Sequence, residues 1–173
     1  MDFNRIFSEL NKKGIKYLVA GGVAVNLHGY VRATADLDLM LLMSDENLAK
    51  YIELIKELGF KPRVPVRLDE FADSQKRKEW VLEKGMKVFS VFNPANMMEG
   101  VDVMIEDYIK FDEAYSRRKV VNTGIDALGR VEVPLVSIED LINLKEQAGR
   151  GRDLIDISAL KEIVREQNEG RKK

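Results

Sequence analysis

Residues Gly21–Leu39 read GGVAVNLHGYVRATADLDL, and this stretch decides the fold. Its Gly-Gly pair directly follows Ile15–Ala20, a short apolar run that is typical of a buried strand. Val23–Leu27 predicts a short helix that ends near Gly29. Ala35–Met43 alternates at first and then becomes wholly apolar, which predicts a strand buried on both faces at its far end. The stretch therefore predicts a strand, a sharp glycine turn, a helix and a second strand.

Two aspartates lie on the second of these predicted strands. Asp36 and Asp38 are two residues apart, so both carboxylates leave the same face of the strand. Aspartate is depleted in strands, and two anions this close repel each other unless a cation lies between them. Magnesium fits, because it is bound by a few carboxylates together with substrate phosphates. The alternative is a half-exposed strand whose solvent face carries two aspartates.

A third aspartate stands alone in a later apolar run. Asp102 lies in Val101–Ile105 (VDVMI), which predicts another strand. If this strand lies beside Ala35–Met43, three carboxylates converge on one spot. Three acids around a magnesium pair are suited to an in-line phosphoryl displacement. The alternative is an aspartate on an edge strand.

The Gly21-Gly22 pair permits a tight turn before a helix whose free amides form a phosphate site. A lone Gly-Gly is more often only a turn. The stretch is neither a G-x-G-x-x-G dinucleotide fingerprint nor a G-K-[ST] phosphate loop.

The rest of the chain alternates between helical and strand patterns. The further predicted helices are a first helix from Phe3 that Lys12-Lys13-Gly14 closes, a helix capped by Asp45 and running to Leu58, a short exposed helix late in Lys61–Glu79, Asp107–Tyr115, a helix after the S-I-E-D cap at Ser137 running to Ala148, and Asp153–Glu166. The further predicted strands are Trp80–Glu83 and Met86–Phe92 around a turn at Lys84-Gly85, and two short edge strands, Lys119–Asn122 and Arg130–Val133, around an Asp126–Gly129 turn. This order predicts an α/β (α+β) fold in which helices flank a mixed β-sheet and a helical segment ends the chain.

Length and composition bound the class of protein. The chain has 173 residues, of which 45% are hydrophobic and 33% charged, which predicts a single domain: a core over residues 1–135 and C-terminal helices over 136–173. It has no cysteine and one histidine, His28, so thiolate zinc sites, cysteine nucleophiles and multi-histidine metal centres are excluded. The net charge of −1 does not indicate a nucleic-acid-binding protein. No signal-peptide core or membrane span is visible in the sequence, so we expect a cytoplasmic protein without a membrane partner.

The motifs together resemble the nucleotidyltransferase superfamily, whose signature is a strand, Gly-Gly or Gly-Ser, a helix, a D-h-D strand and a third acid downstream. More narrowly, residues 21–39 resemble the minimal AbiEii-type nucleotidyltransferases, which include toxins of toxin–antitoxin systems. In that group an arginine and a small hydroxyl residue precede the acid pair, as Arg32 and Thr34 do here. Residues 141–160 (LINLKEQAGRGRDLIDISAL) resemble the group's late motif of a helix lysine, a basic stretch and two acids three apart. Those positions are Lys145, Arg150, Arg152, Asp153 and Asp156.

The resemblance implies roles for these residues. Asp36 and Asp38 would hold two Mg²⁺ ions, with Mn²⁺ as a substitute, and Asp102 would complete one metal site and help to deprotonate the acceptor hydroxyl. Gly21, Gly22 and Thr34 would lie at the bound nucleotide. Arg32 and Lys145 would neutralise phosphate charge, although each could instead be a solvated side chain or part of a structural ion pair. Asp153 and Asp156 would orient basic residues or cap the last helix rather than bind metal. Arg152, which adjoins Asp153, could pair locally and never reach a ligand.

The function that the resemblance implies is magnesium-dependent transfer of a nucleoside monophosphate from a nucleoside triphosphate, such as ATP, to an acceptor hydroxyl, with release of pyrophosphate. The acceptor would be a tRNA 3′ end, as for a toxin, or a small hydroxylated molecule such as an antibiotic, and a cognate antitoxin protein would be a partner. The rival interpretations are a catalytically silent nucleotidyltransferase fold that binds a partner, and a structural protein whose aspartates are accidental. Residues 61–99 carry no recognisable motif, and the aromatic residues Trp80, Phe89 and Phe92 are expected in the core rather than against a nucleobase.

Overall fold

The protein is described here by a computed structural model that covers residues 2–106, 108–126 and 129–170. Over these residues the chain forms one mixed sheet of seven strands in the order β3-β4-β5-β2-β1-β7-β6. The strands are β1 (Tyr17–Val19), β2 (Leu37–Leu41), β3 (Lys61–Pro62), β4 (Val88–Asn93), β5 (Asn96–Met104), β6 (Lys119–Asp126) and β7 (Gly129–Leu135). The helices are α1 (Phe3–Lys12), α2 (Gly21–His28), α3 (Asp45–Glu57), the 3-10 helix η1 (Leu68–Ala72), α4 (Ser74–Lys84), α5 (Phe111–Ser116), α6 (Ile138–Ala148) and α7 (Gly151–Gly170).

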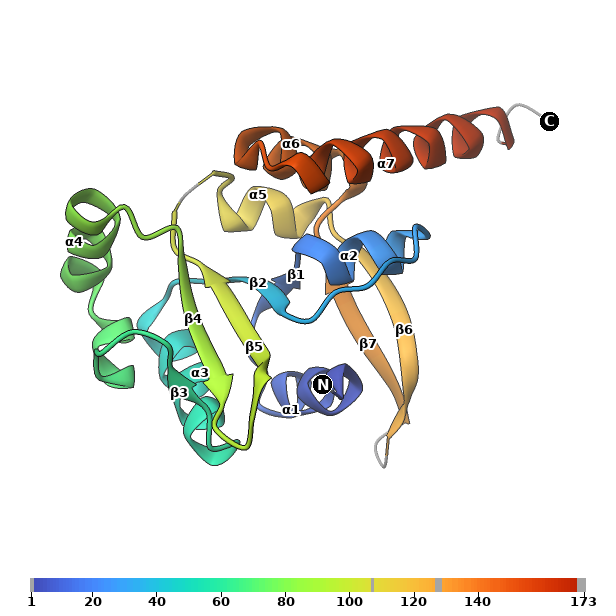
Figure 1. Ribbon diagram of the computed structural model, residues 1–173. Coiled ribbons are helices and arrows are strands. Elements are labelled where there is room, and N and C mark those ends of the chain that lie inside the picture. Colours follow the sequence, from blue (N-terminus) through green and yellow to red (C-terminus); the bar gives the residue numbers. More distant parts are fainter. Residues whose placement is uncertain (1, 107, 127–128, 171–173) are drawn as a thin grey trace.

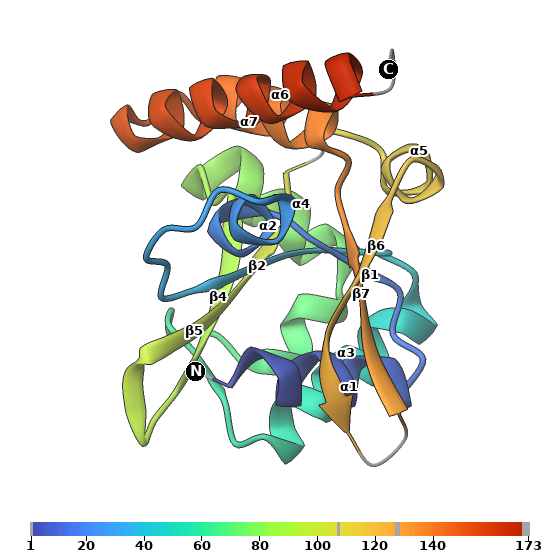
Figure 2. The same cartoon turned by 90° about the vertical axis from the view of Figure 1, so that its right-hand side faces the viewer.

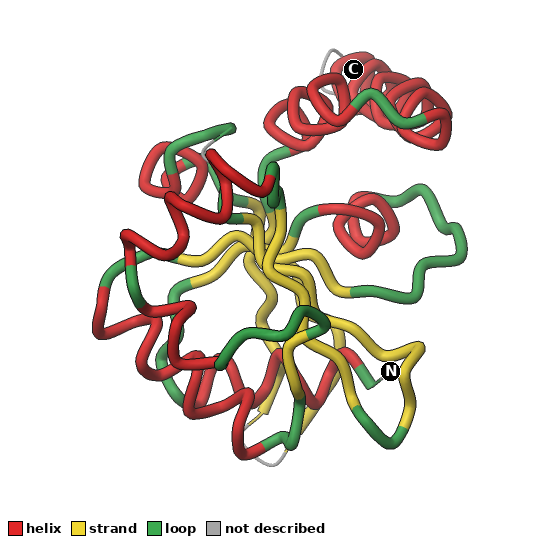
Figure 3. Tube along the Cα trace, turned by 60° about the vertical axis from the view of Figure 1, so that its left-hand side comes forward, coloured by secondary structure: helices red, strands yellow, loops and turns green. Residues whose placement is uncertain are grey.

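The helices cover the sheet from both sides. The elements α1, α3, η1 and α4 lie on one side, and α2, α6 and α7 lie on the other (Figures 1 and 3). Helix α1 packs beside β6 and β7 (Figure 2). Helix α2 contacts β2, α6 and α7, so the helical C-terminal segment reaches the same side of the sheet as the glycine turn. The predicted fold class is confirmed.

Strand pairing at the centre of the sheet brings distant parts of the sequence together. Strand β2 pairs with β1 in antiparallel fashion and with β5 in parallel fashion, and Asp38 lies in register with Asp102. The backbone N–H of Ala20 donates a hydrogen bond of 2.9 Å to the carbonyl oxygen of Asp38, so the glycine turn begins directly beside β2. The predicted neighbourhood of the two aspartate-bearing strands is confirmed.

The predicted strand Trp80–Glu83 is wrong, because these residues belong to α4. The Asp73 carboxylate caps this helix by accepting hydrogen bonds from the backbone N–H groups of Gln75 and Lys76, and Gly85 ends it with a φ of +61°. Lys84-Gly85 is therefore a helix end and not a hairpin turn. Capping at both ends overrides the strand preference of Trp-Val.

The prediction of two short edge strands is wrong for the second of them. Strand β7 lies inside the sheet, between β6 and β1, and its pairing with β1 is parallel at Val19 and Leu135. Of these two strands, β6 alone lies at an edge of the sheet. Because Val131, Val133 and Leu135 are buried, β7 contributes to the core as an internal strand does.

Several helix boundaries also differ from the prediction. Ser44 rather than Asp45 caps α3, because its side chain accepts a hydrogen bond from the backbone N–H of Asn47. Helix α5 begins only at Phe111, and Asp107, where the predicted helix started, lies outside the described residues. The predicted cap at Ser137 is confirmed by a hydrogen bond from the Asp140 N–H.

His28 is the last residue of α2, and it is buried. Residues 127–128 of the predicted turn lie outside the described residues, and the division of the chain at residue 135 stays a prediction. Within the described ranges, no helix combines the length and the apolar character that crossing a bilayer requires.

Candidate functional site

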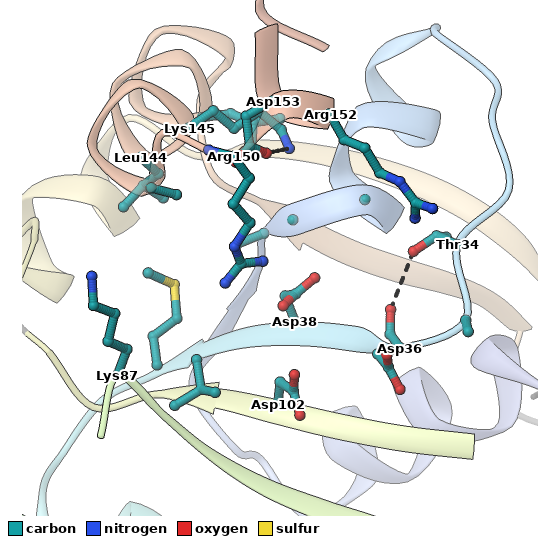
Figure 4. A pocket seen from close by; sticks show the side chains of 18 of the residues that line it. Thr34, Asp36, Asp38, Lys87, Asp102, Leu144, Lys145, Arg150, Arg152 and Asp153 are labelled. Atoms are coloured by element: carbon teal, nitrogen blue, oxygen red, sulfur yellow. Dashed lines mark hydrogen bonds and ion pairs between the residues drawn. The ribbon is translucent and has the colours of Figure 1, made fainter. Parts of the chain in front are cut away.

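A cavity of about 650 Å³ lies over the central strands. Its floor carries Asp36, Asp38 and Asp102, and its walls are formed by the start of α2, the loop before β2, and α6 with the start of α7 (Figure 4). All the site residues predicted from the sequence line this cavity, namely Gly21, Gly22, Arg32, Thr34, Asp36, Asp38, Asp102 and Lys145.

Asp38 and Asp102 are neighbours on the floor of the cavity. They are paired in register on the parallel strands β2 and β5, so both side chains leave the same face of the sheet. On the far side of Asp102, Ser90 of β4 is its register partner, and the Ser90 side chain forms a hydrogen bond with the Asp102 carboxylate. Three adjacent strands therefore fix this pair of carboxylates.

The glycine turn lies directly against Asp38. Gly21 has a φ of +57°, and a Cβ atom at this position would lie 1.8 Å from Oδ2 of Asp38. The backbone N–H of Gly22 donates a hydrogen bond to the Asp38 carboxylate. The N-terminal end of α2 therefore stabilises the Asp38 anion, and the absence of a side chain at Gly21 permits the contact.

Asp36 lies at a bend one residue before β2 rather than within the predicted strand. Its Oδ1 atom lies 3.9 Å from Nη2 of Arg63, and a Cβ atom on Gly100 would lie 2.5 Å from the same oxygen. Among the residues that the structure describes, no three acidic or histidine side chains converge closely enough to hold a metal ion. The predicted convergence of three carboxylates therefore needs correction: all three line one cavity, but Asp36 is turned toward Arg63.

The electrostatics of the floor favour a bound cation. Burial, together with the negative charge of Asp102, raises the pKa of Asp38 to about 6. Burial also raises the pKa of Asp102, with a further contribution from the charge of Asp36. Carboxylate oxygens are the ligands that Mg²⁺ prefers, and a dication would relieve the repulsion that shifts these pKa values. The donor set of Asp36, Asp38 and Asp102 thus fits a magnesium site in its chemistry.

A buried ion-pair network joins the C-terminal helices to the loop before β2. Asp156 is 1% exposed and binds the Arg32 guanidinium through both carboxylate oxygens, with Nε–Oδ1 and Nη2–Oδ2 distances of 2.7 and 2.8 Å. Its Oδ2 atom also lies 2.7 Å from Nζ of Lys145, which in turn lies 3.1 Å from Oδ1 of Asp153. Burial opposes the ionisation of Asp156, but the hydrogen bonds from Arg32 and Lys145 outweigh it and lower the pKa of this carboxyl. The two acids therefore hold basic side chains, and Asp153 also accepts a hydrogen bond of 3.1 Å from the backbone N–H of Arg150 at the start of α7.

The network also engages the two residues that are predicted to bind phosphate. Arg32 and Lys145 line the cavity, yet both are held by Asp156, which is the structural alternative considered for each of them. Arg150 and Arg152 line the same cavity at the start of α7. In Figure 4 the Arg150 side chain extends toward Asp38, and that of Arg152 extends toward Thr34. The positive charge of Arg150 acts on both Asp38 and Asp102.

Further lining residues were not identified from the sequence. One stripe of α6, formed by Leu141, Leu144 and Ala148 around Lys145, makes a mostly apolar wall. Lys87, Met104 and Tyr108 also line the cavity. The spacing of the α6 residues is that of an ordinary core-facing helix. Lys87 lies just before β4, and its carbonyl oxygen accepts a hydrogen bond of 3.1 Å from the Ile105 N–H, so its place in the cavity depends on long-range pairing. No local signal in the sequence marks these positions.

The match to known families decides the classification. The model of the family described as "Nucleotidyl transferase AbiEii toxin, Type IV TA system" matches residues 5–171. The chain belongs to the AbiEii nucleotidyltransferase family. The enzyme class that the sequence motifs predict, a nucleotidyltransferase, is confirmed by this membership. No curated protein sequence matches the chain.

Solved structures show the same fold in other nucleotidyltransferases. A lincosamide antibiotic adenylyltransferase, LnuA, solved with lincomycin bound, is 16% identical with a TM-score of 0.59, over 94% of this chain and 98% of that one. ANT(2″)-Ia in complex with adenylyl-2″-tobramycin is 14% identical with a TM-score of 0.55, over 91% and 84% of the two chains. An antigenic nucleotidyltransferase-like protein from Paracoccidioides brasiliensis is 19% identical with a TM-score of 0.51, over 91% and 72%. At these identities the likeness establishes the fold of this AbiEii-family chain.

Proposed function

We propose that this protein transfers a nucleoside monophosphate from a nucleoside triphosphate to an acceptor hydroxyl and releases pyrophosphate. The observation that carries the proposal is the register pairing of Asp38 and Asp102 on the floor of a cavity whose walls carry Arg32, Lys145, Arg150 and Arg152. Carboxylates below and cations around the cavity suit a triphosphate that binds together with a divalent ion. Membership of the AbiEii family supports the same reaction.

Asp36, Asp38 and Asp102 would hold one or two Mg²⁺ ions, which neutralise phosphate charge in this type of reaction. The chain's own contribution is proton transfer and positioning. The acceptor oxygen attacks the α-phosphorus, the new P–O bond forms, and the bond to the β-phosphate bridging oxygen breaks so that pyrophosphate leaves. The proton of the acceptor hydroxyl passes to the carboxylate of Asp102, whose pKa is raised by burial, so it is a better base than an exposed aspartate.

The arginines at the start of α7 are the main candidates for binding the triphosphate. Arg150 extends toward Asp38 and Arg152 toward Thr34, so both flank the predicted nucleotide position (Figure 4). Arg32 is tied to Asp156 through two hydrogen bonds and would serve as a fixed positive charge. The Asp38 carboxylate already accepts a hydrogen bond from the Gly22 N–H. Gly21 and Gly22 would therefore let the phosphates approach the backbone beside Asp38 rather than in its place.

The charges around Asp102 favour an anionic acceptor. Lys87 lines the cavity, and the charges of Arg63 and Arg150 both act on Asp102. A phosphate-bearing acceptor such as a tRNA 3′ end is attracted by these cations, whereas a polycationic aminoglycoside is repelled. The family description as a toxin supports an RNA acceptor in the cytoplasm and a cognate antitoxin as partner. A small hydroxylated antibiotic is the second candidate, because LnuA and ANT(2″)-Ia share the fold.

The proposal is tested by incubating the purified protein with the four α-³²P-labelled nucleoside triphosphates and total RNA, with Mg²⁺ or with EDTA. We expect label on tRNA-sized bands only with Mg²⁺. Parallel reactions replace the RNA with lincomycin or tobramycin to test the second candidate. If no acceptor is labelled and calorimetry detects no binding of any magnesium nucleotide, the protein is a catalytically silent member of the family that binds a partner instead.

A further inference from the structure

Residues 61–99 have no role in the site as the motifs define it, yet Arg63 reaches it from this segment. Arg63 directly follows β3, and its backbone N–H donates a hydrogen bond of 2.9 Å to the Ser90 carbonyl oxygen of β4. Its side chain passes over the ring of Phe92, with 5.4 Å between the guanidinium carbon and the ring centroid. The Nη2 atom then donates a hydrogen bond of 3.1 Å to the Met97 carbonyl oxygen. The guanidinium is therefore held at a defined place on the β4–β5 hairpin.

From this place the guanidinium meets Asp36. The Nη2 atom lies 3.9 Å from Oδ1 of Asp36. Gly100 of β5 provides the space for this contact, because a Cβ atom there would lie 2.5 Å from Oδ1 of Asp36 and 3.0 Å from Nη2 of Arg63. The Asp36 carboxylate and the guanidinium thus share the gap that the glycine leaves.

We propose that Arg63 is a positioning residue that serves as an internal counter-cation for Asp36. Arg63 holds the Asp36 carboxylate away from Asp38 and Asp102 until a divalent metal ion replaces the guanidinium as the partner of that carboxylate. The inference rests on the proposed function, because it concerns the metal site of that reaction. Two observations carry it: Asp36 is turned toward Arg63 and Gly100, and no metal-binding group of three acids is assembled among the described residues.

The contact is suited to exchange. The side chains of Arg63 and Asp36 are 37% and 47% exposed, and ion pairs with such exposure are weak. A divalent ion therefore competes with Arg63 for the Asp36 carboxylate at a modest cost in binding free energy. This cost lowers the affinity of the nucleotide-free protein for the metal. Arg63 itself keeps its anchors on Phe92 and Met97 when Asp36 leaves.

The test is Mn²⁺ binding to the full-length, nucleotide-free protein, measured by calorimetry or by the EPR signal of free Mn²⁺. We expect R63Q to bind Mn²⁺ about two- to five-fold more tightly than the wild type, the range set by the strength of an exposed ion pair. R63K keeps the charge and is expected to bind as the wild type does. R67Q is the matched control, because Arg67 lies in the same segment, is 82% exposed and pairs with Asp69 away from the cavity.

A double-mutant cycle with D36N separates this role from a general effect of charge. If Arg63 acts by holding Asp36, R63Q tightens Mn²⁺ binding clearly less in the D36N background, where only the effect of the Arg63 charge on Asp102 remains. Equal tightening in both backgrounds, or R63Q binding that is unchanged, weaker or absent, overturns the inference. None of these results contradicts the proposed function, which fails separately if the wild type transfers no nucleotide in the presence of Mg²⁺.

Discussion

Asp38 and Asp102 face the same cavity from adjacent parallel strands, in register, although 63 positions separate them in the sequence. This arrangement places two negative charges side by side in a part-buried site, and burial together with the Asp102 charge raises the pKa of Asp38 to about 6. A fold gains nothing in stability from such a pair. The pair is therefore best explained by a ligand that carries positive charge, and a divalent ion on a nucleotide is such a ligand.

The first prediction concerns the contact between Gly21 and Asp38. We expect Gly21→Ala to lower the free energy of unfolding by about 2–4 kcal/mol, because the left-handed φ costs about 1 kcal/mol and the clash with the carboxylate adds the rest. Gly14→Ala is a matched control, since Gly14 has a φ of +62° and nothing within 4 Å of the added methyl group. Urea denaturation measures both. Equal losses for the two variants would show that the Asp38 contact is not tight.

The second prediction concerns the network around Asp156. Asp156→Asn leaves the buried Lys145 with Asp153 alone and removes the charge that binds Arg32, so we expect a loss of about 3 kcal/mol in the free energy of unfolding. Lys161→Gln breaks an exposed pair with Glu146 between the same two helices and should cost less than about 0.5 kcal/mol. The same urea experiments compare the two. A small effect at Asp156 would mean that the network is not a structural requirement.

The third prediction is a dependence of stability on pH that arises at His28. This side chain is buried, and its Nε2 atom lies 2.9 Å from the Val136 carbonyl oxygen. Burial lowers the pKa of His28 from 6.5, so the unfolded chain binds the proton more readily than the folded protein does. The stability from His28 is complete above pH 6.5 and is lost as the pH falls below this value.

His28→Gln tests this assignment. The glutamine amide can donate to the same carbonyl group but does not titrate, so we expect the variant to lose less stability than the wild type between pH 7.5 and pH 5. The measurement is the thermal midpoint at a series of pH values. Parallel pH profiles for the two proteins would place the titrating group elsewhere.

The sequence predicted which acidic residues and glycines line the cavity, because the signals that mark them are local. Asp36-Leu37-Asp38 and the isolated Asp102 break strand patterns in which aspartate is disfavoured, and Gly21-Gly22 marks the turn beside them. The orientation of Asp36 escaped prediction, because it depends on Arg63 and Gly100, which no motif connects to it.

The parts that failed depend on long-range packing or on caps. Trp80 lies in a run that favours a strand, but the Asp73 cap makes this run a helix, and the Trp80 ring stacks on Phe89 inside the core. The parallel pairing of β7 with β1 could not be read from a short apolar run near the end of a hairpin. The apolar cavity wall on α6 is likewise indistinguishable in sequence from a helix face packed in a core.

The most direct test of the central claim, that the Asp38–Asp102 pair is the reaction centre, is the rate of transfer of α-³²P label by Asp102→Asn. The asparagine keeps the shape of the side chain but neither binds a metal ion as strongly nor accepts the acceptor proton, so we predict a rate at least about 100-fold below the wild type. Asp69→Asn, an exposed carboxylate paired with Lys56, is the control and should retain the wild-type rate. An Asp102→Asn protein that folds normally and transfers label at close to the wild-type rate would contradict the account.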